Sequence, residues 1–202
     1  MPVISGTEGY ANEADKLAVQ YESFTFEALH KDIIPLFPKD AKKALDIGAG
    51  TGRDAAGLAG MGLEVLAVEP VAEMRAHARR LHPSPRIDWL DDCLPQLARV
   101  HARAETFDIV MMTAVLMHFD AAERALIMAR VVPLLAPQGV MALSLRHGPV
   151  PPGRRMFAVA DEDVIALAAT HGLAPMLTLS GKRDKFQRDD VTWSRLVFKH
   201  RD

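Results

Sequence analysis

The spacing of apolar residues along this chain is typical of strands in some segments and of helices in others. Short apolar runs typical of buried strands lie near 44–48, 63–69, 86–90, 107–113, 139–146, 174–179 and 192–199. Helix-compatible segments lie between them, near 53–61, 71–81, 94–102, 121–135 and 161–171. Strands that alternate with helices are typical of a mostly parallel sheet with helices on both faces. The pattern therefore predicts an α/β fold, a three-layer sandwich around a seven-stranded sheet.

Two ends of the chain depart from this regular alternation. Between the last two apolar runs there is only a loop, from Gly181 to Asp190, which permits an antiparallel hairpin at the sheet edge. Before the first strand, helical spacing predicts one helix from Asn12 or Asp15 to about Tyr21 and a second near 25–34. The sheet is thus expected to end in an antiparallel strand, and residues 1–40 are expected to be an addition to a core of residues 41–202.

The glycines after the first apolar run indicate a ligand site. Gly48, Gly50 and Gly52 separate that strand from a helix, and Glu69 ends the next strand seventeen residues later. Glycine lets the backbone turn sharply and lets a ligand approach closely. An acid at the tip of the second strand is placed to accept both hydroxyls of a ribose. The unit predicts a pocket for a nucleoside-bearing cofactor.

Five motifs in order carry a resemblance to a known family. The stretch Leu45 to Gly52 resembles the first motif of class I S-adenosylmethionine-dependent methyltransferases, and the likeness continues through Glu69, 91–95, 107–110 and 134–140. At 134–140 the family usually has a Lys-Pro-Gly-Gly turn, which this chain lacks. The resemblance implies a Rossmann-like sheet with a reversed last strand, S-adenosylmethionine as cofactor, and two N-terminal helices that form a lid over one methyltransferase domain, 1–202.

The same resemblance implies roles for individual cofactor-binding residues. The three glycines would pass beneath the methionine and ribose, Asp46 would hold the loop or reach the ammonium through water, and Glu69 would accept the ribose hydroxyls. Arg53 either meets the methionine carboxylate or pairs with Asp54 or Glu22. Asp92, with Asp91 as the alternative, would accept from the adenine amino group. The cofactor-binding residues so expected are Asp46, Gly48, Gly50, Gly52, Arg53, Glu69, Pro70, Asp92, Cys93 and Thr113.

Residues near the expected methyl group could act on the acceptor. His118 and His147 each follow a strand, and imidazole titrates near neutrality, so either could be a general base; a helix-capping role for His118 stays open. Arg146 and Arg154 could contact the acceptor, although a solvated loop also explains Arg154. An aromatic lid of Tyr10, Tyr21 and Phe24 could face the sulfonium, and helix packing explains these rings nearly as well.

Composition and charge limit the partners. The net charge of −2 provides no general field for nucleic acid or an anionic membrane, and the histidines and the single cysteine show no metal-site spacing. One cysteine and no leader or spanning segment favour the cytoplasm. We therefore expect a small-molecule acceptor, with no metal, and the sequence does not set the oligomeric state. The alternatives are a nicotinamide-dependent oxidoreductase, which shares the glycine turn, and a non-catalytic S-adenosylmethionine-binding protein.

Overall fold

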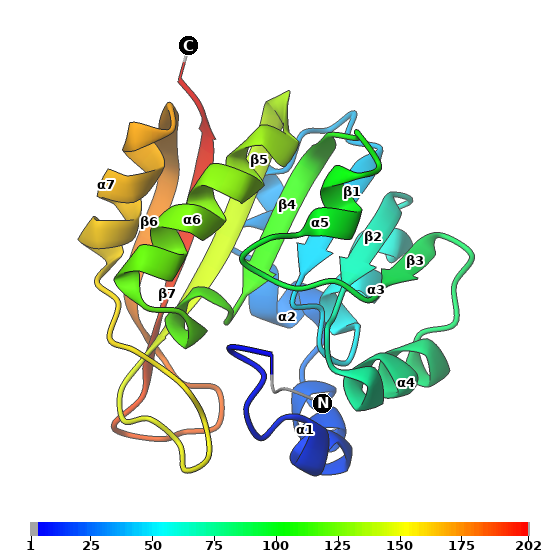
Figure 1. The fold of residues 1–202 in the computed structure, drawn as a ribbon, viewed down its shortest axis with the longest axis vertical. Helices are drawn as coiled ribbons and strands as arrows, with labels where there is room; N and C mark the ends of the chain where they lie inside the picture. Colours follow the sequence, from blue (N-terminus) through cyan, green and yellow to red (C-terminus); the bar gives the residue numbers. More distant parts are fainter. Residues whose placement is uncertain (1–3, 202) are drawn as a thin grey trace.

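A computed structural model describes residues 4–201, in which one sheet of seven strands has helices on both faces (Figure 1). Residues 1–3 of the expected lid and residue 202 of the expected core lie outside the described part. The strands are β1 (Lys43–Ile47), β2 (Glu64–Val68), β3 (Ile87–Leu90), β4 (Phe107–Thr113), β5 (Leu135–His147), β6 (Leu173–Arg183) and β7 (Thr192–His200). The α-helices are α1 (Ala14–Tyr21), α2 (Phe26–His30), α3 (Arg53–Gly60), α4 (Ala72–Leu81), α5 (Ala98–His101), α6 (Ala121–Val131) and α7 (Asp161–Thr170). Short 3-10 helices are η1 (Ala11–Glu13), η2 (Ile34–Leu36), η3 (Leu116–His118) and η4 (Val132–Leu134).

The strand order confirms the predicted fold class. It runs β3-β2-β1-β4-β5-β7-β6. The first five strands of this order pair in parallel, and β7 is antiparallel to both of its neighbours, β5 and β6. The short loop before β7 explains the reversal, because a parallel connection needs a crossover of a dozen or more residues.

Three predicted helices are shorter than the sequence suggested. The helix expected at 121–135 ends at Val131 in α6 and is followed by η4. In place of one helix at 25–34, α2 ends at His30 and η2 follows after a turn. Pro35 fits the first turn of η2, since that turn does not use its missing amide hydrogen. In place of a helix at 94–102, α5 begins only at Ala98, because Leu97 has a positive φ of 48°.

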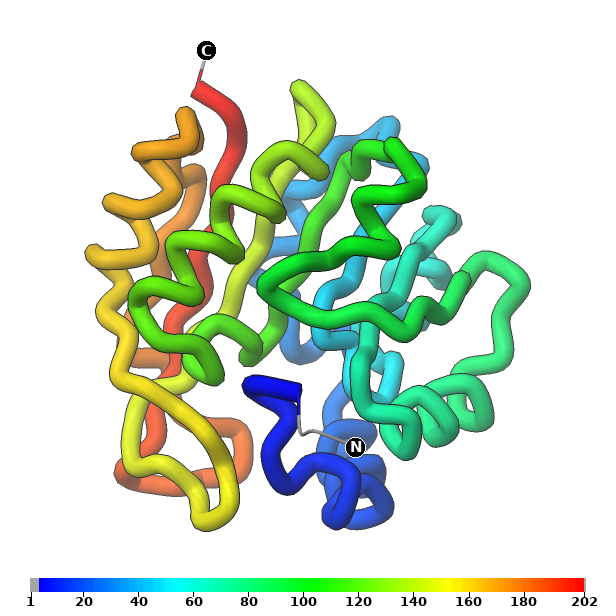
Figure 2. Tube along the Cα trace, in the orientation of Figure 1, coloured from blue at the N-terminus to red at the C-terminus, as the bar shows by residue number. Residues whose placement is uncertain are grey.

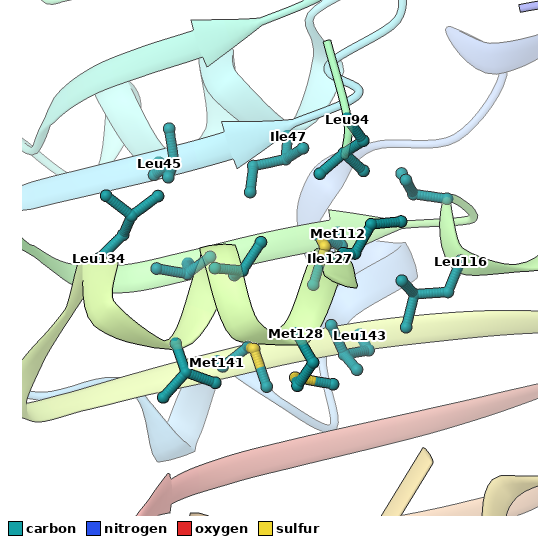
Figure 3. Packing of buried hydrophobic residues seen from close by; sticks show 14 of the residues in the cluster. Leu45, Ile47, Leu94, Met112, Leu116, Ile127, Met128, Leu134, Met141 and Leu143 are labelled. Atoms are coloured by element: carbon teal, nitrogen blue, oxygen red, sulfur yellow. The ribbon is translucent and has the colours of Figure 1, made fainter. Parts of the chain in front are cut away.

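The two-residue period of the strands divides the core between the two faces of the sheet. On one face, Leu45 and Ile47 of β1 and Leu143 of β5 pack against Ile127 and Met128 of α6 (Figure 3). On the other face, the alternate positions of the same strands pack against α2, η2 and α3. Side chains at neighbouring strand positions point to opposite faces, so each strand serves both layers. Burial on both faces is typical of a parallel sheet.

The segment expected as a lid divides into two parts. Phe26, Ile33 and Phe37 are buried in the second core cluster, so α2 and η2 belong to the layer that covers the sheet. By contrast, η1 and α1 pack against α4, at the end of the sheet to which the parallel strands point (Figures 1 and 2). The elements α2 and η2 are part of the core because their apolar side chains pack against the sheet and α3.

Two glycines of α3 provide a matched test of the packing between α2 and α3. A Cβ on Gly57 would lie 2.1 Å from Cγ of Phe26, whereas a Cβ on Gly60 would meet nothing within 4 Å. Gly57→Ala is expected to lower the free energy of unfolding by about 1–3 kcal/mol through overpacking. Gly60→Ala is expected to be neutral or to raise it by up to about 1 kcal/mol through helix propensity. Denaturant unfolding measures both, and equal effects of the two variants would contradict this packing.

Candidate active site

A large cavity opens at the carboxyl ends of the parallel strands. Its volume is about 1470 Å³, and its walls are the glycine loop, the ends of β1, β4, β5 and β7, the N-terminal segment, and the loops at 151–156 and 182–188. These three covering segments gather at one end of the molecule in Figure 1. Pockets for a single small ligand usually hold about 300–1000 Å³. The cavity therefore has room for a cofactor and a second ligand.

The glycine loop is fixed by packing as well as by its turn. Gly48 has a φ of +72° and Gly52 a φ of +89°, in the region where a side chain is strained. A Cβ on Gly48 would lie 2.7 Å from Val115, and one on Gly52 would lie 2.6 Å from Trp89. At Gly50 such a Cβ would make only ordinary contacts, at 3.8 Å from Met74 and 4.0 Å from Tyr21. The loop thus presents bare backbone to the cavity.

Glu69 ties this loop to the end of β2. It is 6% exposed, and its two carboxylate oxygens accept hydrogen bonds from the backbone amides of Gly50 and Val71, both at 2.8 Å. Burial raises the pKa of this carboxyl. A carboxylate offers about four lone-pair sites, so accepting capacity remains on both oxygens. Glu69 lines the cavity, where it can receive further donors.

Asp46 places a buried carboxyl group with one unpartnered oxygen beside the loop. It is 1% exposed and lines the cavity, and its Oδ2 atom has no hydrogen-bond partner among the described residues. Burial, reinforced by the neighbouring Asp54, raises its pKa well above the usual value. A buried carboxylate oxygen without a partner is costly, and a bound cation would compensate for it. The site therefore fits a ligand that carries an ammonium group.

Arg53 pairs with Asp54, one of the three partners that the sequence suggested for it. Its Nε donates to Asp54 at 2.8 Å, and its Nη1 donates to the carbonyl of Tyr21 at 3.0 Å. Asp54 also pairs with His30 at 2.9 Å and is bonded by the side chain of Thr113. Although burial raises it, the charges of His30 and Arg53 hold the pKa of Asp54 well below its usual range. This pairing anchors the start of α3 beneath the cavity, which both Arg53 and Thr113 line.

Of the two candidate adenine acceptors, only Asp92 lines the cavity; Cys93 and Pro70 line it as well. The carboxylate of Asp92 accepts from the amides of Cys93, Arg99 and Val100 at 2.8–2.9 Å, so it also fixes the start of α5. Asp91 is exposed and is ion-paired with an arginine of α4. Burial raises the pKa of the Cys93 thiol, which argues against a reactive thiolate.

His118 and Tyr10 form a hydrogen-bonded pair in the cavity wall. The Nδ1 atom of His118 lies 2.9 Å from the carbonyl oxygen of Arg155, and its Nε2 lies 3.0 Å from the Tyr10 hydroxyl. A carbonyl only accepts, so Nδ1 carries the proton and neutral Nε2 accepts from Tyr10. Burial lowers the pKa of His118 and raises that of Tyr10 well above its usual value. Tyr21 continues the chain through a side-chain hydrogen bond with Tyr10.

Other contacts hold the covering segments together over the cavity. The guanidinium of Arg154 lies 4.3 Å from the ring centroid of Tyr10 and is ion-paired with Glu13. The rings of Phe24 and Phe186 meet at 5.0 Å, which joins the N-terminal segment to the loop before β7. The three aromatic residues proposed for the lid, Tyr10, Tyr21 and Phe24, all line the cavity, and so does Arg154.

Arg146 and His147, both expected near the acceptor, differ in whether they reach the cavity. These neighbours in β5 point to opposite faces of the sheet, and only Arg146 lines the cavity. The imidazole Nε2 of His147 lies 2.8 Å from the hydroxyl of Ser194 and 3.4 Å from the carboxylate of Asp161. The expectation that His147 faces the acceptor is not met by this geometry. Sequence reasoning also missed Arg195, a cavity residue whose signal is a charge directly before the apolar run 196–198 of β7.

Comparison with known families decides the class of this site. A family model described as a methyltransferase domain matches residues 44–139, the segment that carries the glycine loop and Glu69. This match supports the expected class I S-adenosylmethionine-dependent methyltransferase family. S-adenosylmethionine is accordingly its cofactor, and the unpartnered oxygen of Asp46 fits the ammonium of that molecule. No curated protein sequence matches the chain.

Solved structures share the fold of this methyltransferase. A TehB-like methyltransferase from Corynebacterium glutamicum is 19% identical, with a TM-score of 0.66, over 94% of this chain and 99% of that one. Magnesium protoporphyrin IX methyltransferase from Synechocystis is 15% identical, with a TM-score of 0.68, over 96% and 85%. 1,6-Didemethyltoxoflavin-N1-methyltransferase from Burkholderia thailandensis is 20% identical, with a TM-score of 0.64, over 100% and 93%.

Within residues 4–201, no group of three or more His, Cys, Asp or Glu side chains is arranged to hold a metal ion. None of their helices is long and apolar enough to cross a membrane.

Replacing Glu69 tests its place in the methyltransferase. Glu69→Ala is expected to weaken the binding of S-adenosylhomocysteine by about 1.5–3 kcal/mol, the range for hydrogen bonds to a charged group. Glu73→Ala is the matched control, because Glu73 is exposed on α4 and does not line the cavity. Calorimetric titration measures both affinities. Normal binding by Glu69→Ala would place the ribose elsewhere.

Proposed function

We propose that this methyltransferase acts on a small molecule whose accepting atom loses a proton, and that His118 takes up that proton through Tyr10. The observation that carries the proposal is the hydrogen bond of 3.0 Å between the Tyr10 hydroxyl and Nε2 of His118, both in the cavity wall. Because Nδ1 of His118 is held by the carbonyl of Arg155, the free lone pair of the imidazole points at Tyr10.

The enclosure of the cavity supports a small acceptor. Arg154 bridges the N-terminal segment to the loop at 151–156, and Phe24 meets Phe186 of the loop before β7. These contacts cover the space next to the glycine loop and limit the size of what enters. The similar enzyme from Burkholderia thailandensis was solved with 1,6-didemethyltoxoflavin, a small molecule, bound beside S-adenosylhomocysteine. The overall charge of −2 adds no attraction for nucleic acid.

The chemistry divides between cofactor and protein. When bound, S-adenosylmethionine supplies a methyl group on a positively charged sulfur, which keeps the electron pair of the broken carbon–sulfur bond as a neutral thioether. The glycine loop, Glu69 and Asp46 hold the cofactor and fix its orientation. The segments that cover the cavity bring the accepting atom into line and limit its contact with water, which is the main contribution expected from the protein.

Proton transfer follows the hydrogen-bonded pair. The Tyr10 oxygen receives the proton released by the acceptor while the Tyr10 proton passes to Nε2 of His118. The product is an imidazolium whose Nδ1 hydrogen stays bonded to the carbonyl of Arg155. Burial keeps His118 neutral near pH 7 and keeps the proton on Tyr10, so the resting pair is ready to accept.

Histidine variants test this assignment. With S-adenosylhomocysteine formation as readout in a screen of small acceptors, His118→Ala is expected to lose about 10²- to 10⁴-fold in rate while cofactor affinity stays unchanged. His147→Ala is the comparison, because that imidazole lies outside the cavity. Equal losses in the two variants would contradict the role of His118. Cofactor binding without turnover of any acceptor would instead indicate a non-catalytic binding protein.

The pH dependence of the rate provides a separate check. Burial lowers the pKa of His118 below its usual value of 6.5, so the neutral base persists at pH 7 and is lost only as the pH falls through that lower value. The acid limb of the rate profile is therefore expected below pH 6.5. An acid limb above that pH would assign the proton uptake to another group.

A further inference from the structure

Two arginines with unpaired guanidinium donors line the cavity two and three strands away from β1, which leads into the glycine loop. Arg195 in β7 is 8% exposed, and its guanidinium makes no hydrogen bond or ion pair within the described part of the chain. Arg146 in β5 donates from Nη1 to the carbonyl of Pro149 at 2.8 Å, but its buried Nε has no partner among those residues. Both groups thus keep donors available to a ligand.

The register of the sheet brings these two arginines together. Arg146 lies opposite Trp193, and Arg195 lies opposite Ser144, in the antiparallel pairing of β5 with β7. The two arginines are therefore diagonal neighbours on one face, with Cβ atoms about 7–8 Å apart. Side chains of this length can converge on one small group from that spacing.

Nearby acids do not neutralise Arg195. Asp32 and Asp54 attract it at longer range. Asp32 is paired with Lys182 at 3.4 Å, and Asp54 is held by His30 and Arg53. Burial lowers the pKa of Arg195, as expected for a guanidinium that lacks full compensation.

The charges near Arg146 are arranged similarly. Asp184 accepts two hydrogen bonds at 2.8 Å from Arg188 and another from Trp193. Arg188 itself adds a like charge beside Arg146, and Asp190 attracts Arg146 only at longer range. A partly desolvated charge without a close counter-ion is costly, so this end of the cavity favours an anion.

We infer that the acceptor carries an oxyanion, a carboxylate or a phosphate monoester, which Arg146 and Arg195 bind. The guanidinium fork matches both groups, since each presents paired oxygens to paired donors. Anchored there, the acceptor extends across β4 toward the Tyr10–His118 pair, where its accepting atom meets the methyl donor. This inference rests on the proposed function, because it assigns the substrate class of the same cavity.

Binding of simple probes tests the inference without knowledge of the natural acceptor. The protein is saturated with S-adenosylhomocysteine and titrated calorimetrically with phenyl phosphate, benzoate and benzyl alcohol. At least one anion is expected to bind about tenfold or more tightly than the neutral alcohol. The tighter of the two anions identifies the group as phosphate or carboxylate. Equal binding of all three probes would overturn the inference.

Variants locate the anion. Arg146→Gln and Arg195→Met are each expected to weaken binding of the preferred anion about ten- to hundredfold and to leave S-adenosylhomocysteine affinity unchanged. Retained affinity for that nucleoside shows that each variant is folded, and Arg195→Lys keeps the charge should Arg195→Met fail to fold. Arg201→Gln removes an exposed arginine outside the cavity and is the control.

The outcomes separate the two proposals. Anion binding that survives in both arginine variants contradicts this inference alone, as does S-adenosylhomocysteine binding with no preference for anions. Failure of the unmodified protein to bind S-adenosylhomocysteine would contradict the proposed function, and this inference with it.

Discussion

The arrangement of the active site depends on one buried carboxylate that holds two backbone segments. Glu69 accepts from the amide of Gly50 in the glycine loop and from the amide of Val71 before α4. Hydrogen bonds to a charged group contribute about 1.5–3 kcal/mol each, which adds to the packing of Gly48 against Val115 and of Gly52 against Trp89 in fixing the loop. Because Glu69 directly follows β2, this pair of bonds links the first two strands of the cofactor-binding unit at their carboxyl ends.

The alternation of strand positions then determines which side chains reach the cavity. Along the face covered by α2 and α3, the strands are apolar at depth and become polar at the edge, at Asp46, Thr113, Ser144, Arg146 and Arg195. On the other face, the same strands present Leu45, Ile47 and Leu143 to α6, as Figure 3 shows. Because side chains alternate between the two faces along each strand, the same strands form the core and the polar wall of the site.

Much of this arrangement follows from sequence, and the rest depends on contacts between distant segments. The alternation of strands and helices predicted the fold class, and the glycine turn with the acid after the second strand predicted a nucleoside-bearing cofactor, because both are local consequences of a strand–turn–helix–strand unit. The family resemblance then identified that cofactor as S-adenosylmethionine. His147 was misplaced because its neighbour Arg146 occupies the inward position of β5, and one residue of register decides between them.

Pairings across the chain were beyond local pattern. The bond between Tyr10 and His118 joins residues 108 positions apart, and the ion pair of Arg154 with Glu13 joins residues 141 positions apart. No local pattern in the sequence around either residue of these pairs predicts its distant partner. The same holds for Arg195, whose charge directly before the apolar run 196–198 does not by itself reveal that it faces a cavity.

A crystal structure with S-adenosylhomocysteine tests the central claim most directly. The account predicts that the ribose hydroxyls lie within hydrogen-bond distance of Glu69, that the ammonium lies near Asp46, and that the sulfur faces the space between His118 and Arg195. A ribose away from Glu69, or a sulfur directed away from that space, would contradict it.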